Sequence, residues 1–239
     1  MIDLHCHILP GVDDGARTWD MTREMCRIAK HDGITHIVAT PHANSRFRFD
    51  RERHSEHLQE MREMIPDIEF SLGCDFHTSY ENLQDVELNR NHYTIADSQY
   101  LLVEFSDFQT RTQMADILFR LHSAGLETII THPERNPVID ECPDLPEQFV
   151  CMGAHLQITA DAVVGNWGRR QRKTCETLLR KGLVSIIATD AHEPYNRKPV
   201  LSEARKAAGR IVGPVEATRL VDQNPRAVIN NEQLPRFTT

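Results

Sequence analysis

Hydrophobic residues along the chain gather in seven short runs, separated by longer stretches in which apolar residues recur with helical spacing. Several of the short runs are nearly continuous in apolar side chains, which is typical of parallel strands that are covered on both faces. We therefore expect seven β-strands. They are Ile2–His7, His36–Thr40, Ile68–Cys74, Tyr100–Glu104, Thr128–Thr131, His155–Ile158 and Val184–Ala188.

Three of the intervening stretches have a clear helical pattern. In one of them, Met114, Ile117, Leu118 and Leu121 fall at positions i, i+3, i+4 and i+7, so they would share one face of a helix. A glycine follows each stretch, where the left-handed residue that ends a helix belongs. The expected helices are Asp20–His31, Thr112–Ala124 and Thr174–Lys181, which are followed by Gly33, Gly125 and Gly182.

This alternation of strands and helices predicts an α/β fold built from βα units. Seven such units favour a distorted, TIM-like (β/α)7 barrel over an open sheet. The chain has no low-complexity linker, so we expect residues 1–239 to form a single domain. The arginine-rich segment Ala43–Arg53 is the most irregular part and is expected to be a loop or a lid.

Composition excludes several classes of protein. The net charge of −8 argues against a broad nucleic-acid-binding surface. No run approaches the roughly 18 apolar residues that would span a bilayer, and the N-terminus lacks the basic start and apolar stretch of a signal peptide. The six cysteines form no CxxC pair. We therefore expect a cytoplasmic protein with reduced thiols and no membrane insertion.

Residue types that bind metals stand at the ends of six of the seven expected strands. Successive strand ends are 25 to 35 residues apart, about the length of a βαβ crossover. In barrel enzymes, functional residues gather at the carboxyl ends of the strands. In chain order the residues are His5, His7, His42, Asp75, Glu104, His132, Asp190 and His192, and the sixth strand ends near Gln157.

The first and last expected strands carry these residues in pairs. Side chains alternate along a strand, so His5 and His7 would lie on the same side, and Asp190 and His192 repeat this spacing. Barrel closure would bring the two strands together. Mixed histidine and carboxylate ligands suit Zn²⁺, Mn²⁺ or Fe²⁺ better than Ca²⁺. A single HxH motif is more often structural than metal-binding, so the prediction depends on the whole set.

The other histidines are better read as surface or structural residues, with His77 left open because it lies two residues beyond Asp75. The histidines with the structural reading are His31, His36, His54, His57, His92, His122 and His155.

Six sequence blocks together resemble the polymerase-and-histidinol-phosphatase (PHP) superfamily. They are DLHCHILPGVDDGA, ATPH, LGCDFH, VEFS, THPERN and ATDAH. More narrowly, they resemble the bacterial metal-dependent tyrosine-protein phosphatases of capsule and exopolysaccharide operons. The resemblance runs from Asp3 to about Pro225, and the first block is its most specific part.

The resemblance implies a seven-stranded barrel and three divalent metal ions, which are Mn²⁺ in the usual description, with iron, zinc or magnesium as alternatives. It implies that His5, His7, Asp75 and Asp190 hold one ion, that Glu104 and His132 share Asp75 for a second, and that Asp14, His42 and His192 hold the third. It also implies that Arg135 and Arg197 contact the phosphate.

One position departs from the family pattern. The bridging acid in the family is normally glutamate, whereas this chain has Asp75 after Gly73 and Cys74. Aspartate is shorter by one methylene, or roughly 1.5 Å. Either the backbone moves inward at this point or the metals are held less tightly.

The resemblance indicates a phosphomonoesterase that acts on phosphotyrosine in the tail of a bacterial tyrosine kinase. Arg135 and Arg197 would bind the phosphate through charge-assisted hydrogen bonds. Tyrosine leaves as a phenolate, whose conjugate acid has a pKa of about 10, so a strong general acid is less necessary. His42 or His192 could assist where a metal leaves it free.

A cysteine-dependent phosphatase is excluded by the sequence itself. That chemistry needs an arginine six residues after the reactive cysteine. The residues at that spacing are Val12, Asp32, Tyr80, Gln148, Gln157 and Lys181.

Two alternatives stay open at this stage. One is a PHP-class phosphatase for a small substrate such as histidinol phosphate. The other is a metal-bound assembly factor without catalysis, which the complete set of ligands and arginines disfavours. The oligomeric state does not follow from the sequence.

Overall fold

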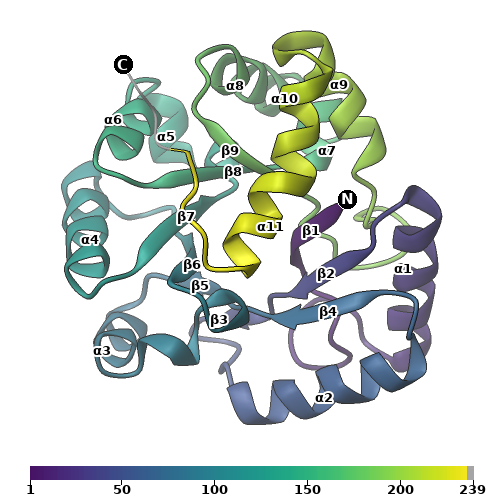
Figure 1. The fold of residues 1–239 in the computed structure, drawn as a ribbon. Coiled ribbons are helices and arrows are strands. Elements are labelled where there is room, and N and C mark those ends of the chain that lie inside the picture. Colours follow the sequence, from purple (N-terminus) through teal and green to yellow (C-terminus); the bar gives the residue numbers. More distant parts are fainter. Residues whose placement is uncertain (236–239) are drawn as a thin grey trace.

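The computed structural model describes residues 1–235, which form an α/β fold with nine strands in two parallel sheets (Figure 1). The first sheet has the order β1 (Ile2–Cys6), β2 (His36–Ala39), β4 (Glu69–Leu72). The second has the order β3 (His42–Ala43), β5 (Asp75–His77), β6 (Tyr100–Glu104), β7 (Glu127–Thr131), β8 (His155–Thr159), β9 (Val184–Ala188). The carboxyl ends of all these strands lie at the same end of the two sheets.

Two of the seven expected strands end slightly early, and each is followed by a short further strand that belongs to the other sheet. The predicted strand His36–Thr40 ends at Ala39, and its continuation pairs in the other sheet as β3. Pro41 lies at this division and has no N–H to donate to a ladder. The predicted strand Ile68–Cys74 divides in the same way at Gly73. A Cβ atom there would lie 3.0 Å from the side chain of Ile95, so the chain passes too close to its neighbours for a larger residue.

The division moves two candidate ligands onto neighbouring strands of the second sheet. His42 of β3 is in register with Asp75 of β5. His77 of β5 is in register with Glu104 of β6. Had the chain continued in line with β2 and β4, His42 and Asp75 would have stayed in the first sheet.

The two sheets also meet at their outer strands, β1 and β9. A single parallel bridge joins Cys6 to Ala191, and the backbone N–H of Asp190 donates to the carbonyl of His5 at 2.8 Å. Apolar side chains from strands of both sheets share one interior cluster, which includes Leu4, Leu102 and Ile186. Val228 of the C-terminal helix packs against the same cluster, so that helix covers the amino-terminal end of the strands (Figure 1).

Helices surround the strands (Figure 1). They are α1 (Trp19–Asp32), α2 (Arg51–Met64), α3 (Tyr80–Leu88), α4 (Arg111–Ser123), α5 (Pro137–Glu141), α6 (Leu145–Cys151), α7 (Ala160–Val164), α8 (Arg169–Arg180), α9 (Ser202–Val212), α10 (Pro214–Thr218) and α11 (Asn224–Ile229). Short helical turns lie at η1 (Arg90–His92), η2 (Ile95–Asp97), η3 (Pro133–Arg135) and η4 (Arg219–Gln223).

All three predicted helices are confirmed. Thr18 caps α1 by accepting a hydrogen bond from the N–H of Met21, and α1 ends at Gly33 with a left-handed φ of 87°. Helix α8 begins five residues before the predicted start at Thr174, because its first turns are arginine-rich and show no apolar pattern. The segment Ala43–Arg53, predicted to be a loop or a lid, is a loop only in part, because Ala43 belongs to β3 and α2 begins at Arg51, where Asp50 caps it.

Candidate metal centre

His5 and His7 form the floor of the candidate site. Both side chains are fully buried, and their Nε2 atoms lie 3.1 Å apart. The other ring nitrogen of each histidine forms a hydrogen bond with a neighbouring side chain. Nδ1 of His5 lies 2.8 Å from the side-chain oxygen of Gln157, and Nδ1 of His7 lies 2.7 Å from Asp13. Each ring therefore presents a fixed Nε2 to the same space, which is how histidine ligands of metals are oriented in proteins.

Asp190 joins this floor from the last strand. Its Oδ1 lies 3.4 Å from Nε2 of His5 and 3.4 Å from Nε2 of His7. Asp190 has a left-handed φ of 53°, a conformation that non-glycine residues rarely adopt and that clusters at functional sites.

A second group is formed by Asp75 and His42, the first residues of β5 and β3, and by Glu104, the last residue of β6. Oδ2 of Asp75 lies 3.1 Å from Nδ1 of His42 and 3.6 Å from Nε2 of His5. Nδ1 of His42 also lies 3.7 Å from Glu104. Among the described residues, neither oxygen of Asp75 nor Nδ1 of His42 has a hydrogen-bond partner, although all three atoms are buried.

His132 extends the second group from the end of β7. Its Nε2 lies 3.7 Å from Oε1 of Glu104. It directly follows β7 and, like Asp190, has a left-handed φ, here of 33°. The backbone is therefore strained at two of the candidate ligands, which the surrounding fold must hold in place.

A third group opens toward solvent. Oδ1 of Asp14 lies 3.4 Å from Nε2 of His42 and 3.5 Å from Nε2 of His192. His42 therefore faces the second group with one ring nitrogen and the third group with the other.

These residues offer three sets of ligand atoms in which all members lie within 4.8 Å of one another. The sets are His5, His7 and Asp75; His42, Asp75 and Glu104; and His7, Asp14, His42 and His192. His132 and Asp190 lie beside these sets at the distances given above. Unpartnered buried carboxylate oxygens are costly unless a cation satisfies them. The residues present thus fit divalent metal ions, with nitrogen and oxygen donors that suit Mn²⁺, Fe²⁺ or Zn²⁺.

The electrostatics of the group agree with this fit. Burial and the charge of Arg135 lower the pKa of His132 to about 3, so its ring stays neutral and keeps a lone pair. Burial would lower the pKa of His5, but Asp75 and Asp190 raise it to about 9. Burial and the negative charge of Asp75 raise the pKa of Glu104 to about 7. Divalent cations would replace the protons that these crowded groups otherwise share.

A cavity of about 400 Å³ lies over this centre. It is lined by Asp14, His42, Asn44, Ser45, Arg46, His77, Glu104, His132, Arg135, Asp190, His192 and Arg197. The two arginines predicted to contact phosphate are thus in its wall. Arg135 and Arg197 each donate a hydrogen bond of 2.6 Å to Oδ2 of Asp190, the oxygen that faces away from His5 and His7.

Sequence reasoning missed three residues that shape this site. Asp13 holds His7, Arg46 lines the cavity, and the indole ring of Trp167 lies against both Arg135 and Arg197. Asp13 stands next to Asp14 in the motif, so the pair of acids was the available signal. Trp167 lies between two glycines, which marks a turn but not its direction.

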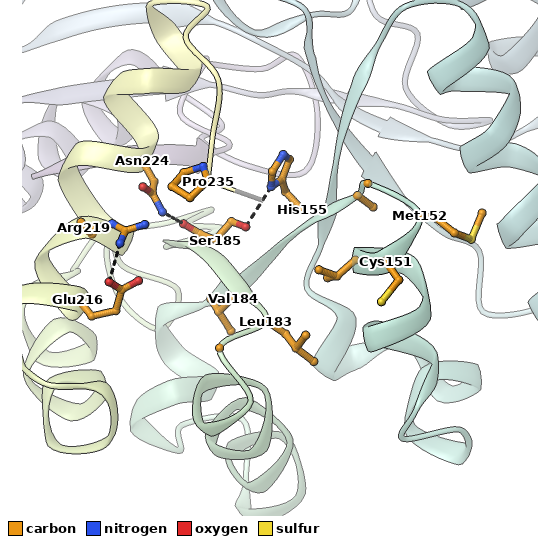
Figure 2. A pocket seen from close by; sticks show the side chains of 14 residues that line it. Cys151, Met152, His155, Leu183, Val184, Ser185, Glu216, Arg219, Asn224 and Pro235 are labelled. Atoms are coloured by element: carbon orange, nitrogen blue, oxygen red, sulfur yellow. Dashed lines mark hydrogen bonds and ion pairs between the residues drawn. The ribbon is translucent and has the colours of Figure 1, made fainter. Parts of the chain in front are cut away.

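A second cavity, of about 360 Å³, lies at the opposite end of the strands (Figure 2). It adjoins the first residues of β8 and β9, where His155 contacts Ser185. The carboxylate of Glu216, which lines this cavity, is paired with Arg219 at 3.0 Å. Among the described residues that line this cavity, none belongs to a cluster of metal-ligand type.

The chain belongs to the CpsB/CapC family of capsular polysaccharide synthesis, whose model matches residues 1–230. The predicted resemblance is therefore confirmed. The chain is 30% identical to the tyrosine-protein phosphatase YwqE of Bacillus subtilis, covering 99% of this chain and 94% of the relative. It is 26% identical to the tyrosine-protein phosphatase CpsB of Streptococcus pneumoniae, covering 97% and 99%.

The fold is similar to that of solved structures. A crystal structure from a study of YwqE and CpsB, described there as unique metal-dependent tyrosine phosphatases, matches with a TM-score of 0.89 and 29% identity, covering 99% of this chain and 97% of that one. A dihydroorotase matches with a TM-score of 0.54 and 16% identity over 100% of this chain and 72% of that one, which shows likeness of fold alone. Within residues 1–235, no helix has the length and apolar content needed to cross a bilayer.

Proposed function

We propose that this protein is a metal-dependent phosphatase that removes phosphate from tyrosine residues in the tail of a bacterial tyrosine kinase of capsule or exopolysaccharide synthesis. The observation that carries the proposal is the position of Arg135 and Arg197 in the wall of a cavity whose floor is made of histidines and carboxylates. Guanidinium groups bind phosphate oxygens in a bidentate manner. The named relatives support the choice of a tyrosine ester.

We assign nine residues as ligands of three divalent ions, with Mn²⁺ as the expected metal and iron, zinc or magnesium as alternatives. His5, His7, Asp75 and Asp190 would hold the first ion, Glu104 and His132 with Asp75 the second, and Asp14, His42 and His192 the third. The ring of His42 lies near Asp75 with Nδ1 and near Asp14 with Nε2, which supports neighbouring positions for the second and third sites. When bound, such ions withdraw charge from phosphate oxygens and lower the pKa of a water molecule toward roughly 7.

The residues of the chain have distinct roles in the reaction. Arg135 and Arg197 bind the phosphate and fix its orientation in the cavity. Both guanidiniums keep in-plane N–H groups beyond those that Asp190 accepts, because an arginine has five donors. The Nε2 atoms of His42 and His192 lie 3.4 and 3.5 Å from Oδ1 of Asp14 in the solvent-facing group. Either ring would assist the departing phenolate where a metal ion leaves its nitrogen free. The phenolate itself needs little assistance in leaving.

We further propose that the two sheets form a distorted (β/α)7 barrel and that residues 1–239 act as a single domain. The bridge between Cys6 and Ala191 and the interior cluster shared by both sheets support this architecture. A cytoplasmic location is part of the proposal, in agreement with cysteines that are free of disulfides in the described chain.

A paired assay tests the proposed function. The metal-loaded protein is given a phosphotyrosine peptide and histidinol phosphate, and the metal content is measured on the same sample. We expect the peptide to be hydrolysed with the higher kcat/KM. Preference for histidinol phosphate would assign a small-molecule phosphatase instead, and no hydrolysis of either ester by a metal-loaded sample would indicate an assembly factor.

A further inference from the structure

The indole of Trp167 lies against both phosphate-binding arginines at once. The guanidinium carbon of Arg135 lies 4.3 Å from the ring centroid, and that of Arg197 lies 5.5 Å from it. Both arginines also share one oxygen of Asp190. Two cations are therefore held side by side between an aromatic face and a single carboxylate oxygen.

The backbone around Trp167 forms a tight turn between α7 and α8. Gly165 and Gly168 flank it with φ values of 96° and 102°, and the N–H of Gly168 donates to the carbonyl of Gly165 at 3.0 Å. Residues other than glycine rarely adopt such backbone angles. Asn166 adds a hydrogen bond of 2.7 Å from its side chain to Asp161. The turn thus fixes the position of the half-buried indole, which also packs against the core.

An aromatic face suits this position because of how a guanidinium is used. A cation–π contact engages the flat face of the guanidinium. Hydrogen bonds to phosphate use the N–H groups in its plane. An acidic residue in place of Trp167 would compete with phosphate for those N–H groups, whereas the indole holds the arginines and leaves the donors available.

We propose that Trp167 is a positioning residue that aligns Arg135 and Arg197 for phosphate binding, an inference that rests on the proposed function of those arginines. It acts through the two guanidiniums that lie against its ring. The ligand that reports it directly is inorganic orthophosphate, the product of the proposed reaction.

The test compares Trp167→Phe and Trp167→Leu in the metal-loaded protein. Orthophosphate affinity is measured by calorimetry, and kcat/KM is measured on a phosphotyrosine peptide. We expect Trp167→Leu to lose about ten-fold in both quantities, as two partly desolvated cation–π contacts predict. Trp167→Phe, which keeps an aromatic face, should lose no more than about three-fold. Trp19→Leu removes the other tryptophan of the chain and serves as the control, with both quantities unchanged.

A second background separates alignment from a general structural role. In the variant that carries both Arg135→Ala and Arg197→Ala, the further change Trp167→Leu should alter neither quantity, because the groups it aligns are gone. An equal loss in both backgrounds, or no loss in the wild-type background, would overturn the inference. If the wild-type protein binds orthophosphate but hydrolyses no ester, the proposed function fails while the affinity comparison still decides the role of Trp167. Absence of orthophosphate binding to the wild-type protein would overturn the inference as well.

Discussion

Nδ1 of His7 donates a hydrogen bond of 2.7 Å to the carboxylate of Asp13, whose side chain is fully buried. Burial would raise the pKa of Asp13, but the charge and hydrogen bond of His7 lower it to about 2, so the acid stays ionised. The same carboxylate accepts the backbone N–H groups of Gly15 and His42. One acid behind the site therefore sets the position of two candidate ligands.

We expect Asp13→Ala to weaken metal binding by about 10- to 100-fold, the usual loss when a partner behind a ligating histidine is removed. Asp13→Asn should fall between this variant and the wild-type protein, because an amide oxygen still accepts hydrogen bonds but carries no charge. Titration with Mn²⁺ measures the effect. Asp20→Ala, at an exposed position of α1, is the matched control. Equal Mn²⁺ affinity in Asp13→Ala and wild type would remove Asp13 from the site.

Arg135→Ala and Arg197→Ala should each lower turnover of a phosphotyrosine peptide while metal content stays nearly unchanged. A charge-assisted contact that is stronger in the transition state is worth roughly 2–4 kcal/mol, or about one to three decades in rate. The two lysine variants should recover part of the loss, because they restore charge without the bidentate geometry. Wild-type kinetics in both alanine variants would contradict the assignment.

Chelation should abolish activity, and Mn²⁺ should restore it best. Thiol alkylation should have little effect, because Cys6, between His5 and His7 in the sequence, is buried with its sulfur toward the carbonyl of Ala191. The exposed thiol is Cys151, in the second cavity at the opposite end of the strands (Figure 2). Full activity after long incubation in excess EDTA, in a sample shown by elemental analysis to be free of metal, would rule out a metal-dependent reaction.

The strand ends were predictable because hydrophobic runs and the polar residues that follow them are local features. His5, His132 and Asp190 all lie at the ends of strands that the pattern located. The break at Gly73, between β4 and β5, was not predictable in the same way. It depends on how closely the chain at Gly73 passes Ile95, which is a tertiary contact.

The two acids of the Asp13–Asp14 pair illustrate a second limit. Sequence does not distinguish two adjacent carboxylates, yet one is buried behind His7 and the other is exposed beside His192. Trp167 is a similar case, because its role follows from the turn that aims it and from arginines that are distant in the chain.

Stability should fall in mild acid because of His54 on α2. Its side chain is buried against Phe49, its Nδ1 has no hydrogen-bond partner among the described residues, and burial lowers its pKa to about 4. An unfolded histidine takes up a proton near pH 6.5. The unfolded state therefore binds more protons between about pH 6.5 and pH 4, and the free energy of unfolding decreases as the pH falls through this range.

Denaturant unfolding at pH 7 and pH 5 measures this effect. From His54 alone we expect a decrease of about 1–2 kcal/mol in the free energy of unfolding. His54→Gln should be less sensitive to pH by that amount, whereas His31→Gln, at an exposed position of α1, should behave like the wild type. The same pH dependence in His54→Gln and wild type would contradict the prediction.

At Asp75 the chain carries a shorter acid than the glutamate that the sequence resemblance implies for the bridging position. Its side chain is fully buried, and Oδ2 lies 3.1 Å from His42 and 3.6 Å from His5. Glutamate, the usual residue in the family, reaches farther by roughly 1.5 Å. We expect Asp75→Glu to bind at least as much metal per chain as the wild type, because a longer acid bridges two cations more readily.

The comparison that decides the role of Asp75 is bound metal per chain in wild type, Asp75→Glu, Asp75→Asn and Asp75→Ala. Asp75→Ala should lose metal outright and Asp75→Asn nearly so, because both remove the anion that two cations would share. If metal content falls in Asp75→Glu, the backbone at Gly73 and Cys74 is adapted to aspartate, since an extra methylene in a packed site typically costs roughly 1–3 kcal/mol. If Asp75→Ala instead binds metal normally and stays active, Asp75 does not bridge the ions, and its unpartnered oxygens need another explanation.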